Sequence, residues 1–295
     1  MFLLSLFVFF TPLMAPSLYA DTTVDSIPYT TRGSGWFQDN REVKPSHTGT
    51  VNLLKQKLST VTKVDSQYRV TRHYRGVHLG DLVTKLEKGP HVDTVILQFR
   101  NGMVVPIGLD KFHENKDSLF LATHIKNSHG KWQRAFPRLR KANPLLNDPR
   151  PLTFSGNKIV VSDAQNWLYP ETQLNPFRYA DSLVGLEFVN YKAYVKQFEV
   201  GEHLGQRIFL GRCQFCHSTR GIGGDYGWDF VKPLPTYKQK QPENLLYHVR
   251  YTKNHALEAG LMMPSQKDFK KGEADALWKW LKASARKKQK PYLPN

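Results

Sequence analysis

Cysteine is almost missing from this chain, which has two in 295 residues, both within five consecutive positions. Two neighbouring cysteines cannot staple a small secreted fold, so a disulfide-rich scaffold is excluded. Long apolar runs are also scarce, because only residues 1–20 could reach into a bilayer, and this excludes a polytopic membrane protein. Acidic residues are few, with 25 Asp and Glu against 42 Lys and Arg, so the net charge of +17 favours an acidic or anionic partner.

The remaining composition is that of a folded protein, since 40% of the residues are hydrophobic and 12% are aromatic. Residues 1–20 carry no charged side chain and end in a run of small residues at Ala20, which predicts a cleaved export signal. An uncleaved anchor is the alternative, although Pro12 and Pro16 interrupt the run. With either reading we expect a periplasmic protein, and the anchor would make it membrane-associated.

Residues 94–107 give the clearest strand pattern of the chain. Apolar residues alternate on both sides of Asn101-Gly102, which predicts a β-hairpin with a tight turn. Pro106 cannot donate to a neighbouring strand, so the second strand is expected at a sheet edge. Before the hairpin, residues 79–86 repeat apolar side chains at helical spacing and are followed by a Gly-Pro stop.

Two further strands are expected at residues 158–162 and 182–189, separated by a stretch rich in proline and asparagine. Residues 22–195 therefore predict an α+β domain with long loops. We find no internal repeat and no low-complexity segment.

The segment Tyr74-Arg75-Gly76-Val77-His78-Leu79-Gly80-Asp81-Leu82, with the strand pair after it, resembles the molybdopterin-binding oxidoreductases of the sulfite oxidase type. The resemblance implies that residues 30–195 adopt a relative of that mixed α/β fold. Catalysis in that family depends on a cysteine thiolate bound to molybdenum, and this region has no cysteine. We therefore expect a scaffold without molybdopterin.

The only two cysteines lie in Cys213-Gln214-Phe215-Cys216-His217, the Cys-x-x-Cys-His pattern of c-type haem attachment. The two thiols can add to the two vinyl groups on one porphyrin edge, and the histidine can then bind the iron. A redox-active Cys-x-x-Cys, half of a zinc site and a plain disulfide are the alternatives. Leu204, Ile208 and Phe209 predict a helix before the motif, where thioredoxin-like proteins have a strand, and a second cysteine pair for zinc is missing.

A second strong ligand to the iron would close the haem to external molecules. Met262 and Met263 precede Pro264 and are the only methionines of the C-terminal region, so one of them is expected in this role. The alternatives are that both methionines fill the core, or that His248 or His255 is the ligand.

Residues 197–285 resemble a class I cytochrome c. The positions that match the helix contacts and the axial methionine-proline motif of that family are Gly205, Phe209, Met263-Pro264, Leu277 and Trp280. The resemblance implies an all-α cytochrome c domain in which Cys213 and Cys216 hold the haem and His217 and Met263 bind its iron. It also implies that a proline carbonyl, from Pro233 or Pro235, orients the imidazole. The glycine-rich segment 220–227 either matches the family or is an ordinary surface loop.

The sequence thus predicts two domains, an α+β domain followed by an all-α cytochrome c domain and a basic tail at residues 286–295. The expected function is single-electron transfer by an exported monohaem protein, a carrier rather than an enzyme. Its partner is an acidic redox protein or an anionic membrane surface, and no nucleic-acid motif is present. A haem-based sensor of small molecules, or an oxidoreductase with a cofactor in the first domain, remains the alternative.

Overall fold

The computed structural model of the protein describes residues 25–32, 37–38, 41–42, 47–64, 70–86, 88–89, 91–115, 117–137, 153–161, 175–178, 180–201, 203–232, 234–251 and 266–287. The predicted export signal, Met262, Met263, His255 and all but two residues of the basic tail lie outside these ranges. Within them, every helix is too short or too polar to span a bilayer. Residues 25–189 are called the N-terminal part below, and residues 190–287 the C-terminal part.

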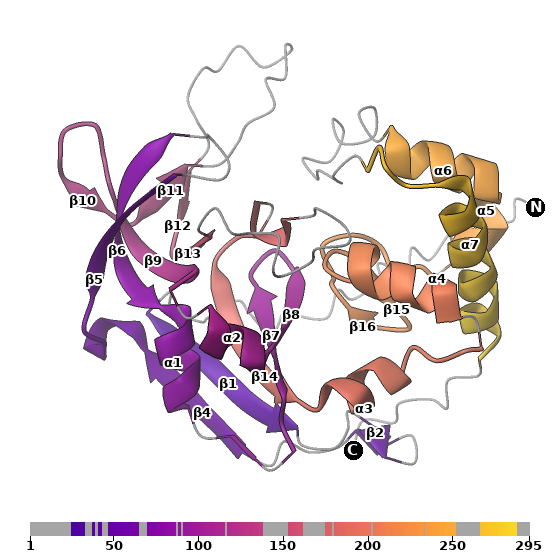
Figure 1. The fold of residues 1–295 in the computed structure, drawn as a ribbon, viewed down its shortest axis with the longest axis horizontal. Coiled ribbons are helices and arrows are strands. Elements are labelled where there is room, and N and C mark those ends of the chain that lie inside the picture. The colour runs from indigo at the N-terminus through magenta and orange to yellow at the C-terminus, as the bar shows by residue number, and fades with distance from the viewer. Residues whose placement is uncertain are drawn as a thin grey trace, which may run out of the picture.

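The first sheet of the N-terminal part has five strands in the order β4-β1-β14-β7-β8 (Figure 1). Its strands are β1 (Ser26–Arg32), β4 (His47–Asn52), β7 (Thr94–Phe99), β8 (Val104–Gly108) and β14 (Leu183–Val189). Strands β1 and β14 run parallel, and the other neighbours are antiparallel. All seven residues of β14 are buried, which shows that both faces of this sheet are covered.

The second sheet has the order β10-β9-β6-β5, and β13 also pairs with β9, at residues 119–122. Its strands are β5 (Ser59–Val64), β6 (Thr71–His78), β9 (Leu119–Lys126), β10 (Trp132–Gln133) and β13 (Lys158–Val161). Four short strands form two separate pairs, β2 (Phe37–Gln38) with β3 (Arg41–Glu42), and β11 (Ala135–Pro137) with β12 (Thr153–Ser155). Helices α1 (Leu79–Lys85) and α2 (Leu109–Glu114) follow β6 and β8.

The local predictions for the N-terminal part are confirmed. Strands β7 and β8 form the expected hairpin, and Gly102 in its turn has φ of +82°, which favours glycine. Pro106 lies in β8, which is an edge strand as predicted. The helix predicted at residues 79–86 is α1, and the two later strands are β13 and β14.

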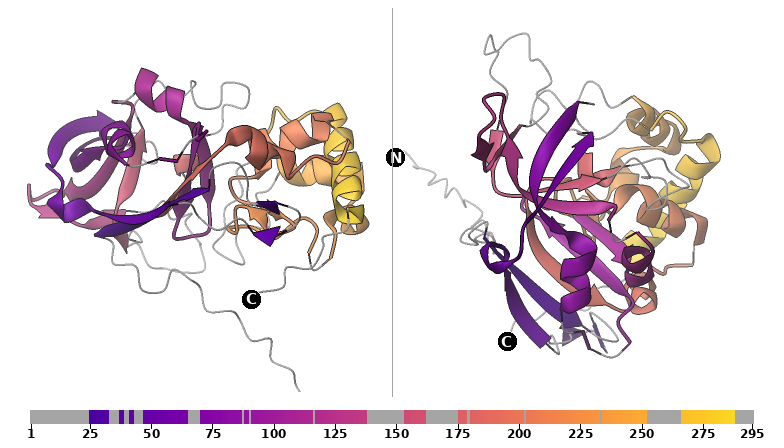
Figure 2. Two further views of the ribbon diagram at one scale, coloured as in Figure 1. Left: turned by 90° about the horizontal axis from the view of Figure 1, so that it is seen from below. Right: turned by 60° about the vertical axis from the view of Figure 1, so that its left-hand side comes forward.

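The C-terminal part contains most of the helices. They are α3 (Tyr191–Lys196), α4 (His203–Ile208), a π-helical turn (Phe209–Cys213), α5 (Thr236–Gln239), α6 (Pro242–Arg250) and α7 (Lys271–Arg286). A small hairpin of β15 (Ser218–Thr219) and β16 (Ile222–Gly223) follows the Cys-x-x-Cys-His segment. Figure 2 shows the strands of the two large sheets on one side of the molecule and helices α4 to α7 on the other.

The prediction of a separate all-α cytochrome c domain is wrong, because the described chain forms one mixed α/β structure with several sheets. The two parts share their hydrophobic cores. Phe215 belongs to the core between the two sheets, whereas Ile96 of β7 and Val189 of β14 belong to the core of the helices. The helices thus cover the outer face of the first sheet, which sequence periodicity alone does not reveal.

Candidate functional site

The helix before the Cys-x-x-Cys-His segment is held against α7. Gly205 of α4 lies so close that an added Cβ would be 2.3 Å from the carbonyl oxygen of Ala276. The ring of Phe209 stacks on Trp280, with 4.9 Å between centroids, and Trp280 Nε1 donates to the Phe198 carbonyl oxygen at 3.1 Å. These contacts fix the position of the π-helical turn, and therefore the position of Cys213 at its end. Ile208 and Phe209 are buried as expected, but Leu204 is 47% exposed.

The two cysteines are free thiols with little contact with water. Cys213 is buried and Cys216 is partly buried. Burial raises the pKa of each thiol to about 12, so both are protonated at neutral pH. Among the described residues no group of three His, Cys, Asp or Glu side chains could hold a metal ion. The two cysteines are also not joined to each other as a disulfide.

The imidazole of His217 is buried and held in one orientation. Its Nδ1 lies 3.0 Å from the carbonyl oxygen of Trp228 and must donate, because a carbonyl oxygen only accepts. The ring also stacks on Phe230, with 4.5 Å between centroids. Desolvation lowers the pKa of His217, so the ring is neutral, and its Nε2 has no hydrogen bond to a described residue. A neutral imidazole with Nδ1 bound and Nε2 free is the form that binds a metal ion.

The carbonyl that orients His217 comes from Trp228 and not from a proline. Pro233 lies outside the described residues, and Pro235 precedes α5 as its N-cap. Sequence reasoning also missed Asp229, whose carboxylate ties down the loop that carries this carbonyl. Its Oδ2 accepts from Ser218 Oγ at 3.1 Å and its Oδ1 accepts from the amide of Val231 at 2.7 Å. An Asp directly after a Gly-Trp pair in a loop is a weak signal for such a turn.

The glycine-rich segment 220–227 packs around the Cys-x-x-Cys-His segment and is not an ordinary surface loop. A Cβ on Gly227 would lie 2.4 Å from Cε1 of His217. A Cβ on Gly223 would lie 2.5 Å from the carbonyl oxygen of His217, and one on Gly224 would lie 2.3 Å from that of Phe215. Glycine at these positions lets the backbone close over the imidazole.

Of the two residues between the cysteines, Phe215 faces the N-terminal part and Gln214 bonds within the C-terminal part. Phe215 is buried among the core residues of the sheets, and its carbonyl oxygen accepts from the amide of Val104 at 3.0 Å. The side chain of Gln214 is buried too and accepts from the hydroxyl of Tyr194 at 3.0 Å. An apolar residue between the cysteines was the available sign of this contact, but the sequence did not show what it packs against.

Of the four residues that the sequence offers as a second ligand, Met262, Met263 and His255 lie outside the described residues. His248 of α6 is described, and its ring centroid lies 6.0 Å from that of Trp228, which in turn lies 5.4 Å from His217. Trp228 is therefore a common neighbour of both imidazoles.

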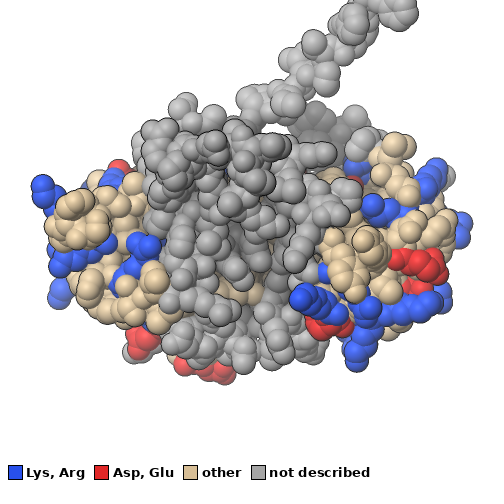
Figure 3. All heavy atoms as spheres, turned by 90° about the horizontal axis from the view of Figure 1, so that it is seen from above, with Lys and Arg blue, Asp and Glu red and all other residues tan. Residues whose placement is uncertain are grey.

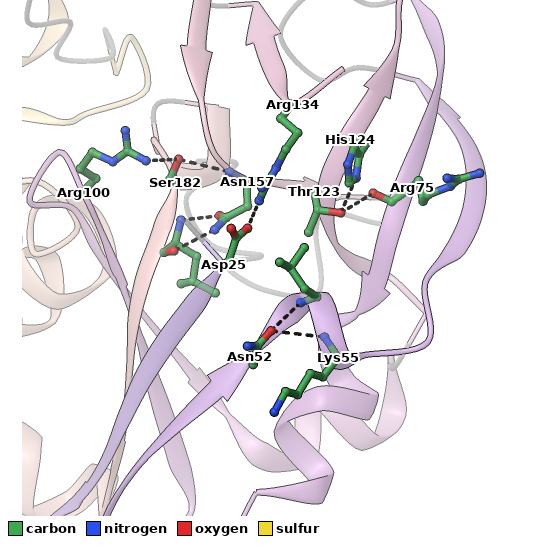
Figure 4. Close-up of polar contacts among 12 residues, drawn as sticks. Asp25, Asn52, Lys55, Arg75, Arg100, Thr123, His124, Arg134, Asn157 and Ser182 are labelled. Carbon is green, nitrogen blue, oxygen red and sulfur yellow. Dashed lines mark hydrogen bonds and ion pairs between the residues drawn. The ribbon is translucent and has the colours of Figure 1, made fainter. Parts of the chain in front are cut away.

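The N-terminal part holds its own polar contacts at a distance from this site in the sequence (Figure 4). Arg134 donates to Asp25, which lowers the pKa of that carboxyl group. Asn157 joins β13 to β14, since its side chain exchanges hydrogen bonds with Leu183 at 2.7 and 3.0 Å. Burial, with nearby Arg134 and Arg75, lowers the pKa of His124, so this cluster binds protons less readily than an exposed histidine.

No known protein-family model matches the chain, and no curated protein matches it in sequence. The chemical interpretation therefore depends on the site itself.

Proposed function

We propose that the protein carries one covalently attached c-type haem and transfers single electrons. Cys213 and Cys216 would bind the haem through thioether bonds, and His217 would bind its iron. Met263 is the proposed second ligand, with Met262 as the rival. The observation that carries the proposal is the buried, neutral imidazole of His217, next to two free thiols. Its Nδ1 is bound to the Trp228 carbonyl, and its Nε2 has no hydrogen bond to a described residue.

The residues around the segment fit such a group. The thiols are free and protonated, as they must be before they add to vinyl groups. Gly227 brings the backbone against the imidazole without a side chain, where a Cβ would collide with Cε1 at 2.4 Å. The hydrogen bond from Nδ1 to the Trp228 carbonyl increases the electron density at Nε2 and so strengthens it as a ligand. When bound, the haem would supply the one-electron couple.

The proposed partner is an acidic redox protein, or an anionic membrane surface, outside the cytoplasm. Lys and Arg are more numerous than Asp and Glu on the face in Figure 3, at both ends of the described surface. On α7, Lys271, Lys279 and Arg286 are exposed. Basic surfaces speed association with acidic partners at low salt. Export is supported by the uncharged residues 1–20.

The test is an optical spectrum of the full chain, exported in a host with haem-attachment machinery. It is recorded oxidised, reduced, and reduced under carbon monoxide, for the wild type and for Cys213→Ala with Cys216→Ala. We expect a sharp low-spin α band that carbon monoxide does not change, and no bound haem in the double variant. Ready binding of carbon monoxide would contradict a closed electron carrier, and a wild type without covalent haem would contradict the proposal as a whole.

A further inference from the structure

A cavity of about 640 Å³ lies where the N-terminal and C-terminal parts meet. Ligand pockets of about 300–1,000 Å³ occur preferentially at such junctions. The N-terminal part contributes the edge strand β8 and the start of α2, and the C-terminal part contributes α4 and the π-helical turn. The cavity takes no part in the proposed haem attachment, apart from Gln214, which lines it.

The surface between the polar groups of the cavity is apolar. Ile107 and Pro106 of β8 line it from one part of the chain, and Leu210 lines it from the other, all three being buried. Tyr191 adds an aromatic ring, and its backbone amide donates to Asp93 Oδ1 at 2.7 Å. A ligand would therefore need an apolar body.

The two parts of the chain contribute opposite charges to the lining. Arg207 of α4 brings a guanidinium that has no hydrogen bond or ion pair with a described residue. Asp110 of α2 brings a carboxylate that also has no hydrogen bond or ion pair with a described residue. This carboxylate lies over Gly108, where an added Cβ would be 2.4 Å from its Oδ1. Lys111 also lines the cavity but is paired with Glu114 at 3.0 Å. The lining thus offers the guanidinium of Arg207 from the C-terminal part and the carboxylates of Asp110 and Asp93 from the N-terminal part, Asp93 already accepting from the Tyr191 amide.

We propose that this cavity binds a short apolar peptide with free termini, of two or three residues. Its carboxylate would pair with Arg207, its ammonium group with Asp110, and its side chains would lie on Ile107 and Leu210. A guanidinium matches a carboxylate with two parallel hydrogen bonds, and a carboxylate accepts those of an ammonium group. The volume suits a ligand of this size.

The test is isothermal titration of the full chain with leucylphenylalanine, its N-acetyl derivative and its C-terminal amide. Each derivative lacks one terminal charge and is otherwise alike. We expect saturable binding of the free dipeptide. The affinity of each derivative should be lower by about ten-fold or more, as for a lost charge-assisted hydrogen bond. No saturable binding, or equal binding of all three compounds, would overturn the proposal.

Two variants then assign the charges. Arg207→Gln is expected to weaken the free dipeptide and the N-acetyl form about ten-fold and to leave the amide unchanged, since the amide has no carboxylate. Asp110→Asn is expected to weaken the free dipeptide and the amide about ten-fold and to leave the N-acetyl form unchanged, since that form has no ammonium group. Both residues are exposed, so the fold should tolerate these substitutions, and Lys279→Gln on α7 is the matched control. If Arg207→Gln binds all three compounds like the wild type, the site is wrong. None of these outcomes depends on haem.

Discussion

The most constrained single residue of the candidate site is His217, held by the Trp228 carbonyl on one ring nitrogen and closed in by Gly227. The Cys-x-x-Cys-His pattern pointed to this histidine as a candidate site residue, but it did not predict which residues surround the ring. The carbonyl acceptor was expected at a proline, because the family resemblance places one there, whereas the chain turns earlier and Asp229 fixes that turn. Backbone groups leave no residue-specific signal, so this part could not be predicted.

Gly227→Ala tests the closure over the imidazole. The new methyl group would lie 2.4 Å from Cε1, so the ring or the backbone at residue 227 must shift. We expect a loss of about 1–3 kcal/mol in the free energy of unfolding, from overpacking, together with a changed optical spectrum of the proposed haem. Gly272→Ala on α7 is the control, because nothing lies within 4 Å of its added Cβ. Equal spectra for both variants would contradict the account.

Asp25 predicts a pH dependence in the N-terminal part. The hydrogen bond from Arg134 lowers the pKa of this carboxyl group below its usual 3.8. A lowered folded-state pKa means that the stabilisation is present above the unfolded-state pKa and is lost as the pH falls through the folded-state value. Asp25→Asn should therefore reduce the free energy of unfolding at pH 7 by up to about 1 kcal/mol, since the pair is partly exposed.

Urea unfolding of both proteins at pH 7 and at pH 3 checks this. The difference between wild type and Asp25→Asn should shrink at pH 3. A difference that stays constant with pH would show that the Arg134 contact contributes through packing and not through charge.

At the scale of helices and strands, local sequence patterns were sufficient to predict single elements, but they did not predict which elements pack against each other. The turn at Asn101-Gly102 and the apolar repeat of α1 specify their own structure, because turn chemistry and helical spacing act between neighbours in the chain. Leu204 was one of three apolar residues that predicted the helix α4, yet it is exposed, since the contact with α7 is made through Gly205 and Phe209. Which face is buried depends on the neighbouring element.

Gly205→Ala tests the close crossing of α4 and α7. Alanine favours a helix over glycine by about 1 kcal/mol, so an isolated helix would gain stability. Here the added Cβ would meet the Ala276 carbonyl oxygen at 2.3 Å, and we expect a lower melting temperature. Leu204→Ala on the same helix, at a 47% exposed position, should change the melting temperature little. A Gly205→Ala protein as stable as the wild type would show that the helices can separate without loss.

At the scale of the whole molecule, the two parts are joined by their cores. Phe215 fills the core between the sheets, while Ile96 and Val189 extend the first sheet into the helical core. The sequence separated the parts because it showed two resemblances side by side, and a contact between distant segments has no periodicity to reveal it. The fold-class prediction failed at this scale.

The shared cores predict that both parts unfold together. Urea unfolding followed by far-ultraviolet circular dichroism and by tryptophan fluorescence should give coincident transitions. Phe215→Ala should lower the stability by about 3–5 kcal/mol by leaving a cavity in the core of the sheets. Two separate transitions in the wild type would contradict a joined structure and would favour independent units.

The central claim is the covalent haem on Cys213 and Cys216, and the intact mass of the exported protein tests it most directly. The account predicts a mass higher than that of the polypeptide by one haem, retained after denaturation, and absent from the variant with Cys213→Ala and Cys216→Ala. A wild-type protein of polypeptide mass, produced where a known c-type cytochrome is matured, would contradict the claim.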